Sequence, residues 1–140
     1  MTTRRPVVLC VEDDAPTRQI LGKVLARLPV EPILASEPFM AIETARQVQP
    51  QLLMLDLMLP GMSGWELLGR IRADSPGRDF RVMILTAKDS SAERLMAANV
   101  AQVDYYLAKP FDPIQLGHDV LRLLNLTSPA SLQPALKGGS

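Results

Sequence analysis

The chain has 140 residues, of which 47% are hydrophobic and 21% are charged. This length suits a single domain, and the composition is that of a globular protein rather than a disordered or fibrous one. Fifteen Lys and Arg residues balance fifteen Asp and Glu residues. The cationic excess that drives binding to a phosphate backbone is therefore missing, and we expect no direct nucleic-acid binding.

Two further features argue against a membrane or secreted protein. The apolar runs, such as 7–11, are far shorter than the roughly 20 residues of a membrane helix. Cys10 is the single cysteine, which excludes a disulfide framework and agrees with a reducing cytoplasm. Because Cys10 lies inside an apolar run, we expect a buried core residue rather than a reactive thiol.

Apolar runs and helical patterns alternate along the chain. The runs are continuous and rich in β-branched residues, which is typical of strands buried on both faces. The helical patterns repeat apolar residues at three- and four-residue spacing. In chain order we predict a strand at 7–11, a helix at 17–28, a strand at 33–35, a helix at 36–48, a strand at 52–55, a helix at 63–71, a strand at 82–85, a helix at 90–99, a strand at 105–107 and a helix at 113–124.

Short motifs mark where several of these elements begin. Asp14 and Asp112 each stand one or two residues before a proline, the pattern of a helix N-cap followed by proline in the first turn. Ser63 and Ser90 are each followed three residues later by Glu, which is a capping box. Two prolines bracket a short turn at 29–32.

Five strands that alternate with five helices predict a parallel sheet with helices on both faces and right-handed connections. Of the doubly wound strand orders, 2-1-3-4-5 suits five strands at this length. We therefore predict a flavodoxin-like (βα)5 domain of the α/β class over residues 5–126. Residues 127–140 are typical of a flexible tail, a linker or an expression remnant, because their composition shifts to Ser, Pro and Gly.

Ionisable residues stand at the carboxyl ends of the predicted strands. In this strand order the sheet reverses between the first and third strands, and ligands of such sheets bind there. Glu12 and Asp13 follow the first strand and Asp56 follows the third, so their carboxylates should share one crevice. Such crowded negative charge needs compensation, which Mg²⁺ and the ammonium group of Lys109, after the fifth strand, could supply.

This set of residues suits phosphoryl chemistry. An aspartate carboxylate can attack a phosphoryl group and form an aspartyl phosphate, a reaction that needs mainly in-line positioning and neutralised phosphoryl oxygens. Asp56 stands alone at its strand end and is the candidate nucleophile, whereas Glu12 and Asp13 form the metal-binding pair. Thr86 adds a hydroxyl at the end of the fourth strand.

The residues at these strand ends also form an ordered set of motifs. The set resembles the receiver domain of two-component response regulators, and the match spans residues 5 to 126. Each motif alone is weak evidence, but their order is specific. The motifs are Glu12-Asp13-Asp14, Asp56-Leu-Met58-Leu-Pro60-Gly61, Thr86-Ala87 and Lys109-Pro110.

The resemblance implies a phosphoacceptor and a metal site. Asp56 would accept a phosphoryl group from the phosphohistidine of a histidine kinase. Mg²⁺ would be bound by Glu12, Asp13 and Asp56 together with the backbone carbonyl of Met58. Such a module catalyses only its own phosphorylation and dephosphorylation, so we do not expect an enzyme that turns over a separate substrate.

The resemblance also implies a conformational switch. Lys109 would pair with the phosphate, and its peptide bond to Pro110 would be cis. Thr86 would turn its hydroxyl towards the phosphoryl group and let Tyr106 move from outward to inward. Tyr105 faces the opposite side of the strand and therefore cannot take this role.

The expected partners follow from this switch. A sensor histidine kinase or a phosphotransfer protein would supply the phosphoryl group. The face built by the predicted elements 90–99, 105–107 and 113–124 would then bind an output partner or an effector domain. A weak or phosphorylation-dependent dimer is a further expected assembly, whereas neither nucleic acid nor a membrane is an expected partner.

Two other functions remain open at this point. A Mg²⁺-dependent phosphohydrolase also uses an Asp nucleophile, but such enzymes usually carry Asp-x-Asp after the first strand. Here Asp56 follows the third strand, and Met58, two residues later, cannot transfer a proton. A flavin-binding module has a similar fold, but the acids at the strand ends would repel the phosphate of FMN.

Overall fold

A computed structural model describes residues 4–87 and 103–126 and centres on one β-sheet. The strand order is β2-β1-β3-β4-β5, which confirms the predicted order, and every pairing is parallel. The strands are β1 (Val7–Val11), β2 (Glu31–Ala35), β3 (Leu52–Asp56), β4 (Arg81–Ala87) and β5 (Tyr105–Lys109).

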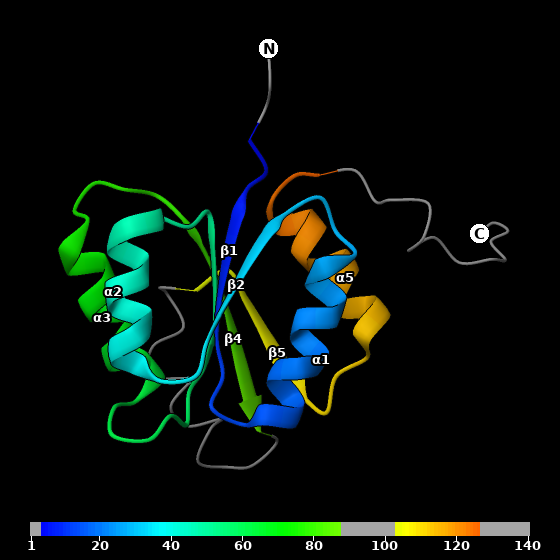
Figure 1. Ribbon diagram of the computed structural model, residues 1–140, viewed down its shortest axis with the longest axis horizontal. Helices are drawn as coiled ribbons and strands as arrows, with labels where there is room; N and C mark the ends of the chain where they lie inside the picture. Colours follow the sequence, from blue (N-terminus) through cyan, green and yellow to red (C-terminus); the bar gives the residue numbers. More distant parts are fainter. Residues whose placement is uncertain (1–3, 88–102, 127–140) are drawn as a thin grey trace, which may run out of the picture.

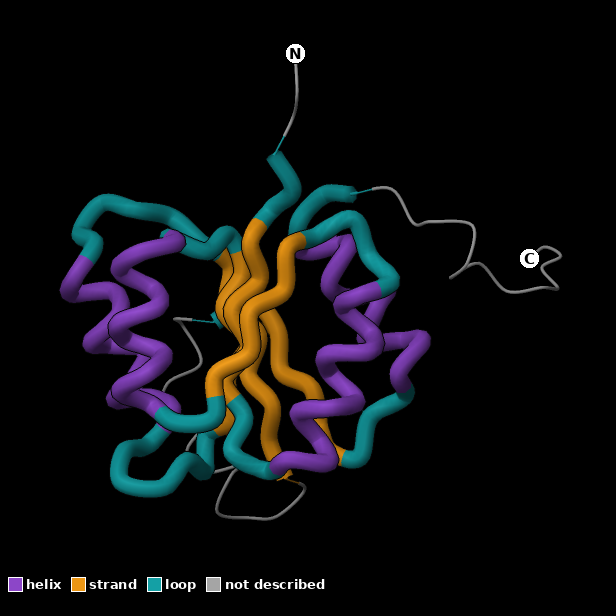
Figure 2. Tube along the Cα trace, viewed as in Figure 1, coloured by secondary structure: helices purple, strands orange, loops and turns teal. Residues whose placement is uncertain are grey.

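Helices cover both faces of the sheet (Figure 1 and Figure 2), with α2 and α3 on one side and α1 and α5 on the other. The described helices are α1 (Ala15–Ala26), α2 (Pro38–Val48), α3 (Gly64–Asp74) and α5 (Pro113–Leu123). The helix predicted at 90–99 lies outside the described residues. Among the helices described, none has the length and apolar character needed to cross a membrane.

The helix starts carry the predicted capping residues. The carboxylates of Asp14 and Asp112 and the hydroxyl of Ser63 each accept a hydrogen bond from a backbone N–H in the first turn of α1, α5 and α3, respectively. These bonds satisfy donors that a helix start otherwise leaves unpaired. Helix α1 begins at Ala15, directly after its cap, and so starts earlier than the predicted position 17.

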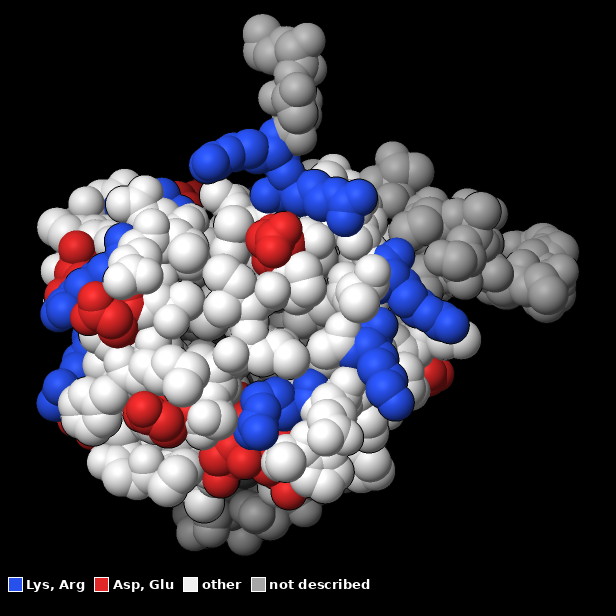
Figure 3. Space-filling model, viewed as in Figure 1, with Lys and Arg blue, Asp and Glu red and all other residues white. Residues whose placement is uncertain are grey.

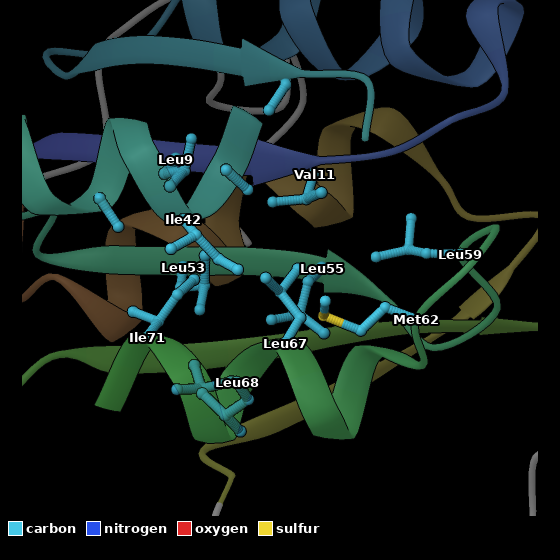
Figure 4. Packing of buried hydrophobic residues seen from close by; sticks show 14 of the residues in the cluster. Leu9, Val11, Ile42, Leu53, Leu55, Leu59, Met62, Leu67, Leu68 and Ile71 are labelled. Carbon is cyan, nitrogen blue, oxygen red and sulfur yellow. The ribbon is translucent and has the colours of Figure 1, made fainter. Parts of the chain in front are cut away.

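The sheet separates two hydrophobic cores. Alternate residues of a strand point to opposite faces, so on β1 Leu9 packs with α2 and α3, whereas Cys10 packs with α1 and α5. Figure 4 shows the first core, in which Leu55 of β3 lies near Leu67 of α3 and Leu53 lies near Ile71. Because β1 and β3 are covered on both faces, their side chains are almost all fully buried, which explains their continuous apolar sequence.

Two local predictions were wrong, one in β2 and one at the start of α2. Pro32 lies inside β2 rather than in a turn, and the strand starts at Glu31. Since β2 is an edge strand, it can accommodate a residue without an N–H. Helix α2 starts at Pro38 rather than at position 36, and its N-cap is Glu37, whose carboxylate accepts a hydrogen bond from the Phe39 N–H at 2.8 Å.

Candidate functional site

The carboxyl ends of β1 and β3 meet, as predicted. Val11 and Leu55 are register partners, so the residues that follow, Glu12 and Asp56, extend from neighbouring strand ends. Carboxylate oxygens of Glu12, Asp13 and Asp56 all lie within 4.8 Å of one another. On the face shown in Figure 3, Asp and Glu atoms gather with Lys and Arg atoms at the lower edge, where these strands end.

Burial distinguishes the three acids. Glu12 is 0% exposed and Asp56 is 5% exposed, whereas Asp13 is exposed. Two buried carboxylates this close are unfavourable unless they are paired or hydrogen-bonded. The site therefore depends on the groups that contact Glu12 and Asp56.

Lys109 ends β5 and joins the two buried acids. Its Nζ donates to Glu12 Oε1 at 2.6 Å and to Asp56 Oδ2 at 2.8 Å. Burial raises the pKa of Glu12, an effect that the bond from Lys109 opposes. Burial also acts to lower the pKa of Lys109, but the hydrogen bonds to Asp56 and Glu12 outweigh it, so this pKa is raised and the ammonium stays charged. The peptide bond from Lys109 to Pro110 is cis.

Backbone groups orient the remaining carboxylate oxygens. The Met58 N–H donates to Asp56 Oδ1 at 2.9 Å, and the Asp14 N–H donates to Glu12 Oε2 at 3.1 Å. Each buried carboxylate is thus held at one oxygen by Lys109 and at the other by a backbone N–H two residues further along the chain. This arrangement fixes both acids with little rotational freedom.

An open groove leads along the loop after β3. It has a volume of about 570 Å³, and Asp13, Met58 and Ser63 are among its lining residues. Met58 is 56% exposed, so its thioether lies at the mouth of the site while its N–H holds Asp56.

Thr86 lies on β4, which pairs with β3, and Tyr106 lies on β5, on the far side of β4 from Asp56. Thr86 is 3% exposed, and its hydroxyl donates to the Ala87 carbonyl at 3.2 Å. Tyr106 packs against the core below α2 and α3. Its hydroxyl is buried without a hydrogen-bond partner in the described part of the chain, and burial raises its pKa. Tyr105 faces the other core, with the Arg122 guanidinium 5.3 Å from its ring centre.

Sequence reasoning missed one residue beside the site. Arg18, in the first turn of α1, donates from Nη1 to the carbonyl oxygens of Glu12 at 2.8 Å and Asp13 at 3.2 Å. The sequence offered one indication of this contact, because Arg18 is a basic residue in the first turn of the helix that follows the acidic pair Glu12 and Asp13. Its backbone partners, however, cannot be identified from residue types alone.

Comparisons with known proteins agree with this geometry. The family model described as the response regulator receiver domain matches residues 8–121. The phosphate regulon transcriptional regulatory protein PhoB of Shigella flexneri is 31% identical over 130 residues, which are 93% of this chain and 56% of that protein. The DNA-binding response regulator MtrA of Mycobacterium bovis is 34% identical over 83% of this chain and 49% of its own length. The chain thus spans about half the length of these relatives.

Solved structures give the same result. The receiver domain of the sensor histidine kinase PA1611 from Pseudomonas aeruginosa, which has a magnesium ion in its active site cleft, is 26% identical with a TM-score of 0.76. The match covers 86% of this chain and 98% of that one. The signal receiver domain of an HD domain-containing protein from Pseudomonas fluorescens is 28% identical with a TM-score of 0.75, over 87% of this chain and 96% of that one.

Proposed function

The chain belongs to the family of response regulator receiver domains, whose general function is phosphorylation-activated signalling, and we propose that Asp56 is its phosphoacceptor. The observation that carries this proposal is the position of Asp56. It ends the central strand β3, and Lys109 binds one of its carboxylate oxygens while two further acids lie within 4.8 Å. The donor would be the phosphohistidine of a histidine kinase or of a phosphotransfer protein.

The proposed step transfers a phosphoryl group from an imidazole nitrogen of the donor to a carboxylate oxygen of Asp56. A carboxylate oxygen of Asp56 attacks phosphorus, the bond between phosphorus and the donor imidazole nitrogen breaks, and that nitrogen keeps the electron pair and takes up a proton. The N–H of Met58 on Oδ1 and the ammonium of Lys109 on Oδ2 hold the carboxylate in place for this attack. Lys109 is then positioned to pair with the added phosphoryl oxygens.

The residues around Asp56 fit a magnesium ion. Three carboxylates face one ammonium group, so the cluster keeps an excess of negative charge. All the available donors are oxygens, which is the ligand type that Mg²⁺ prefers. Glu12, Asp13 and Asp56 would hold the ion with the backbone carbonyl of Met58. When bound, the ion offsets the charge on the phosphoryl oxygens.

We further propose that Thr86 and Tyr106 transmit the phosphorylated state. Asp56 pairs in register with Leu85, the residue before Thr86, so a phosphoryl group on Asp56 lies close to the end of β4. The Thr86 hydroxyl would exchange its bond with the Ala87 carbonyl for one with the phosphoryl group. Tyr106 has a buried hydroxyl with no partner in the described residues, so no hydrogen bond in this part of the chain opposes its movement.

The partner that reads this change would bind near β5 and α5, where Tyr106 and the last helix lie. In this proposal the domain is a signalling module that modifies only itself. The side chain two residues beyond Asp56 is the thioether of Met58, which cannot serve as the acid or base that hydrolysis of small phosphate esters requires.

Intact mass after incubation with acetyl phosphate and Mg²⁺ tests the proposal. We expect one phosphoryl adduct on the native chain, and none in Asp56→Asn or in the presence of EDTA. Asp79→Asn is the matched control, because Asp79 precedes β4 at the opposite end of the sheet and should leave the adduct unchanged. An adduct of equal yield on Asp56→Asn would show that Asp56 is not the acceptor.

A further inference from the structure

We infer that Arg18 is a positioning residue of the acidic site: it fixes the backbone of Glu12 and Asp13 so that their carboxylates converge with Asp56. The inference rests on the proposed function and assigns a role to a residue outside the carboxylate cluster. Arg18 touches no reacting atom. It acts on the segment that carries two of the three acids.

The segment between β1 and α1 has little regular structure to hold it. Strand β1 ends at Val11, and Asp14 is the N-cap of α1, so Glu12 and Asp13 belong to neither element (Figure 1). Neither residue has a full set of strand or helix hydrogen bonds. Their backbone conformation must therefore be fixed by individual contacts.

Arg18 supplies the contacts to the carbonyl groups. Its Nη1 donates to Glu12 O at 2.8 Å and to Asp13 O at 3.2 Å, and these carbonyls have no other hydrogen bond within residues 4–87 and 103–126. The N–H of Glu12 is bound to Ala35 O at 3.0 Å. Loss of Arg18 would thus leave two adjacent carbonyls unpaired, one of them on a fully buried residue.

The direction of these bonds explains why a cation can stand so close to a proposed cation site. Lys109 binds the carboxylate oxygens of Glu12 and Asp56, whereas Arg18 binds only backbone carbonyls. Arg18 therefore orders the segment without occupying a carboxylate oxygen that a metal ion would need. An arginine suits this task because one nitrogen can donate to two carbonyls at once.

The charge of Arg18 and its positioning role have opposite effects on Mg²⁺ binding. Removal of a nearby positive charge favours the binding of a cation. Disorder of the segment that carries Glu12 and Asp13 weakens binding, because loss of a group that orients metal ligands typically costs about 10-fold or more in affinity. A decrease in Mg²⁺ affinity on removal of Arg18 therefore indicates the positioning role, whereas an increase indicates an effect of its charge alone.

Calorimetric titration with Mg²⁺ tests the inference on the native chain and three variants. We expect Arg18→Ala to bind Mg²⁺ about 10-fold more weakly, and Arg18→Lys to recover part of the loss, since an ammonium can donate to a carbonyl. Lys23→Ala is the matched control. It removes one positive charge from an exposed position of the same helix, and it should leave the affinity unchanged or slightly higher. Affinity that is equal or higher in Arg18→Ala would overturn the inference.

A second readout needs neither metal nor phosphorylation. The Asp14 N–H is bound to the Glu12 carboxylate, so its hydrogen exchange reports whether that side chain stays in place. Arg18→Ala should exchange this amide faster while amides in the middle of β3 stay protected, which shows that the fold persists. Unchanged exchange at Asp14 would also overturn the inference. If the native chain neither binds Mg²⁺ nor accepts a phosphoryl group, the proposed function fails, and faster exchange in Arg18→Ala would still support the role of Arg18.

Discussion

Gly64, the first residue of α3, lies against the end of β3, and Gly64→Ala should destabilise the protein strongly. A Cβ at this position would lie 2.4 Å from the carbonyl oxygen of Asp56, 2.7 Å from Leu55 Cδ1 and 2.9 Å from Leu57 Cα. Normal contact requires about 3.5 Å, so α3 and β3 would have to separate by about 1 Å. Two of the three atoms belong to the backbone, which cannot rotate away. We therefore expect the free energy of unfolding to fall by about 3 kcal/mol, near the upper end of the range usual for an overpacked core.

Gly69→Ala is the matched control for this substitution. Gly69 lies in the same helix, is exposed and has no atom within 4 Å of an added Cβ. The change should stabilise the protein by about 0.5–1 kcal/mol, because alanine loses less backbone entropy in a helix.

Urea unfolding measures both effects. With an m-value of about 2 kcal/mol/M, a loss of about 3 kcal/mol lowers the midpoint by about 1.5 M. Gly64→Ala should also slow the modification of Asp56 by acetyl phosphate, since it displaces the backbone of that residue. If Gly64→Ala unfolds at the same urea concentration as the native chain, the close packing of α3 on the end of β3 is refuted.

Three other changes test separate parts of the structure. Ser63→Ala removes the N-cap of α3 and should cost about 1 kcal/mol in urea unfolding; an unchanged midpoint would show that the cap contributes nothing. Lys109→Met leaves the buried Glu12 carboxylate without its ammonium partner and should destabilise the metal-free protein by about 3 kcal/mol. Mg²⁺ should stabilise this variant more than it stabilises the native chain. An equal gain in both would contradict the proposal that Mg²⁺ and Lys109 offset the charge of the same carboxylates. Burial raises the pKa of Tyr106 above 10.0. The stability that the neutral phenol contributes to the folded protein is therefore fully present below pH 10.0 and is lost as the pH rises through the raised pKa. In Tyr106→Phe the urea midpoint should therefore decrease less at alkaline pH than it does in the native chain. An identical decrease in both proteins would show that the Tyr106 hydroxyl is not buried.

The meeting of Glu12, Asp13 and Asp56 could be predicted because it depends on topology alone. Continuous apolar runs indicated central parallel strands, and parallel strands end at one edge of the sheet. The proximity of Lys109 to these carboxylates could be predicted in the same way, since Lys109 ends another strand of that sheet. Such predictions need only the order of elements and the residue at each end.

Other features could not be predicted, because they depend on individual side-chain geometry. The bonds of Arg18 go to backbone carbonyls, which every residue type offers equally. Pro32 suggested a turn because proline breaks most strands, and only the edge position of β2 makes it acceptable there. The hydroxyl of Thr86 bonds to its neighbouring carbonyl, a local preference that residue spacing does not reveal.

Chemical trapping tests most directly whether Asp56 accepts the phosphoryl group. Borohydride reduces an acyl phosphate of aspartate to homoserine, and peptide mapping then identifies its position. We expect homoserine at Asp56 after treatment with acetyl phosphate and Mg²⁺, and at no other position. Reduction at Asp13 or Glu12 with Asp56 intact would contradict this expectation, because the acids assigned to the metal would then be the acceptors.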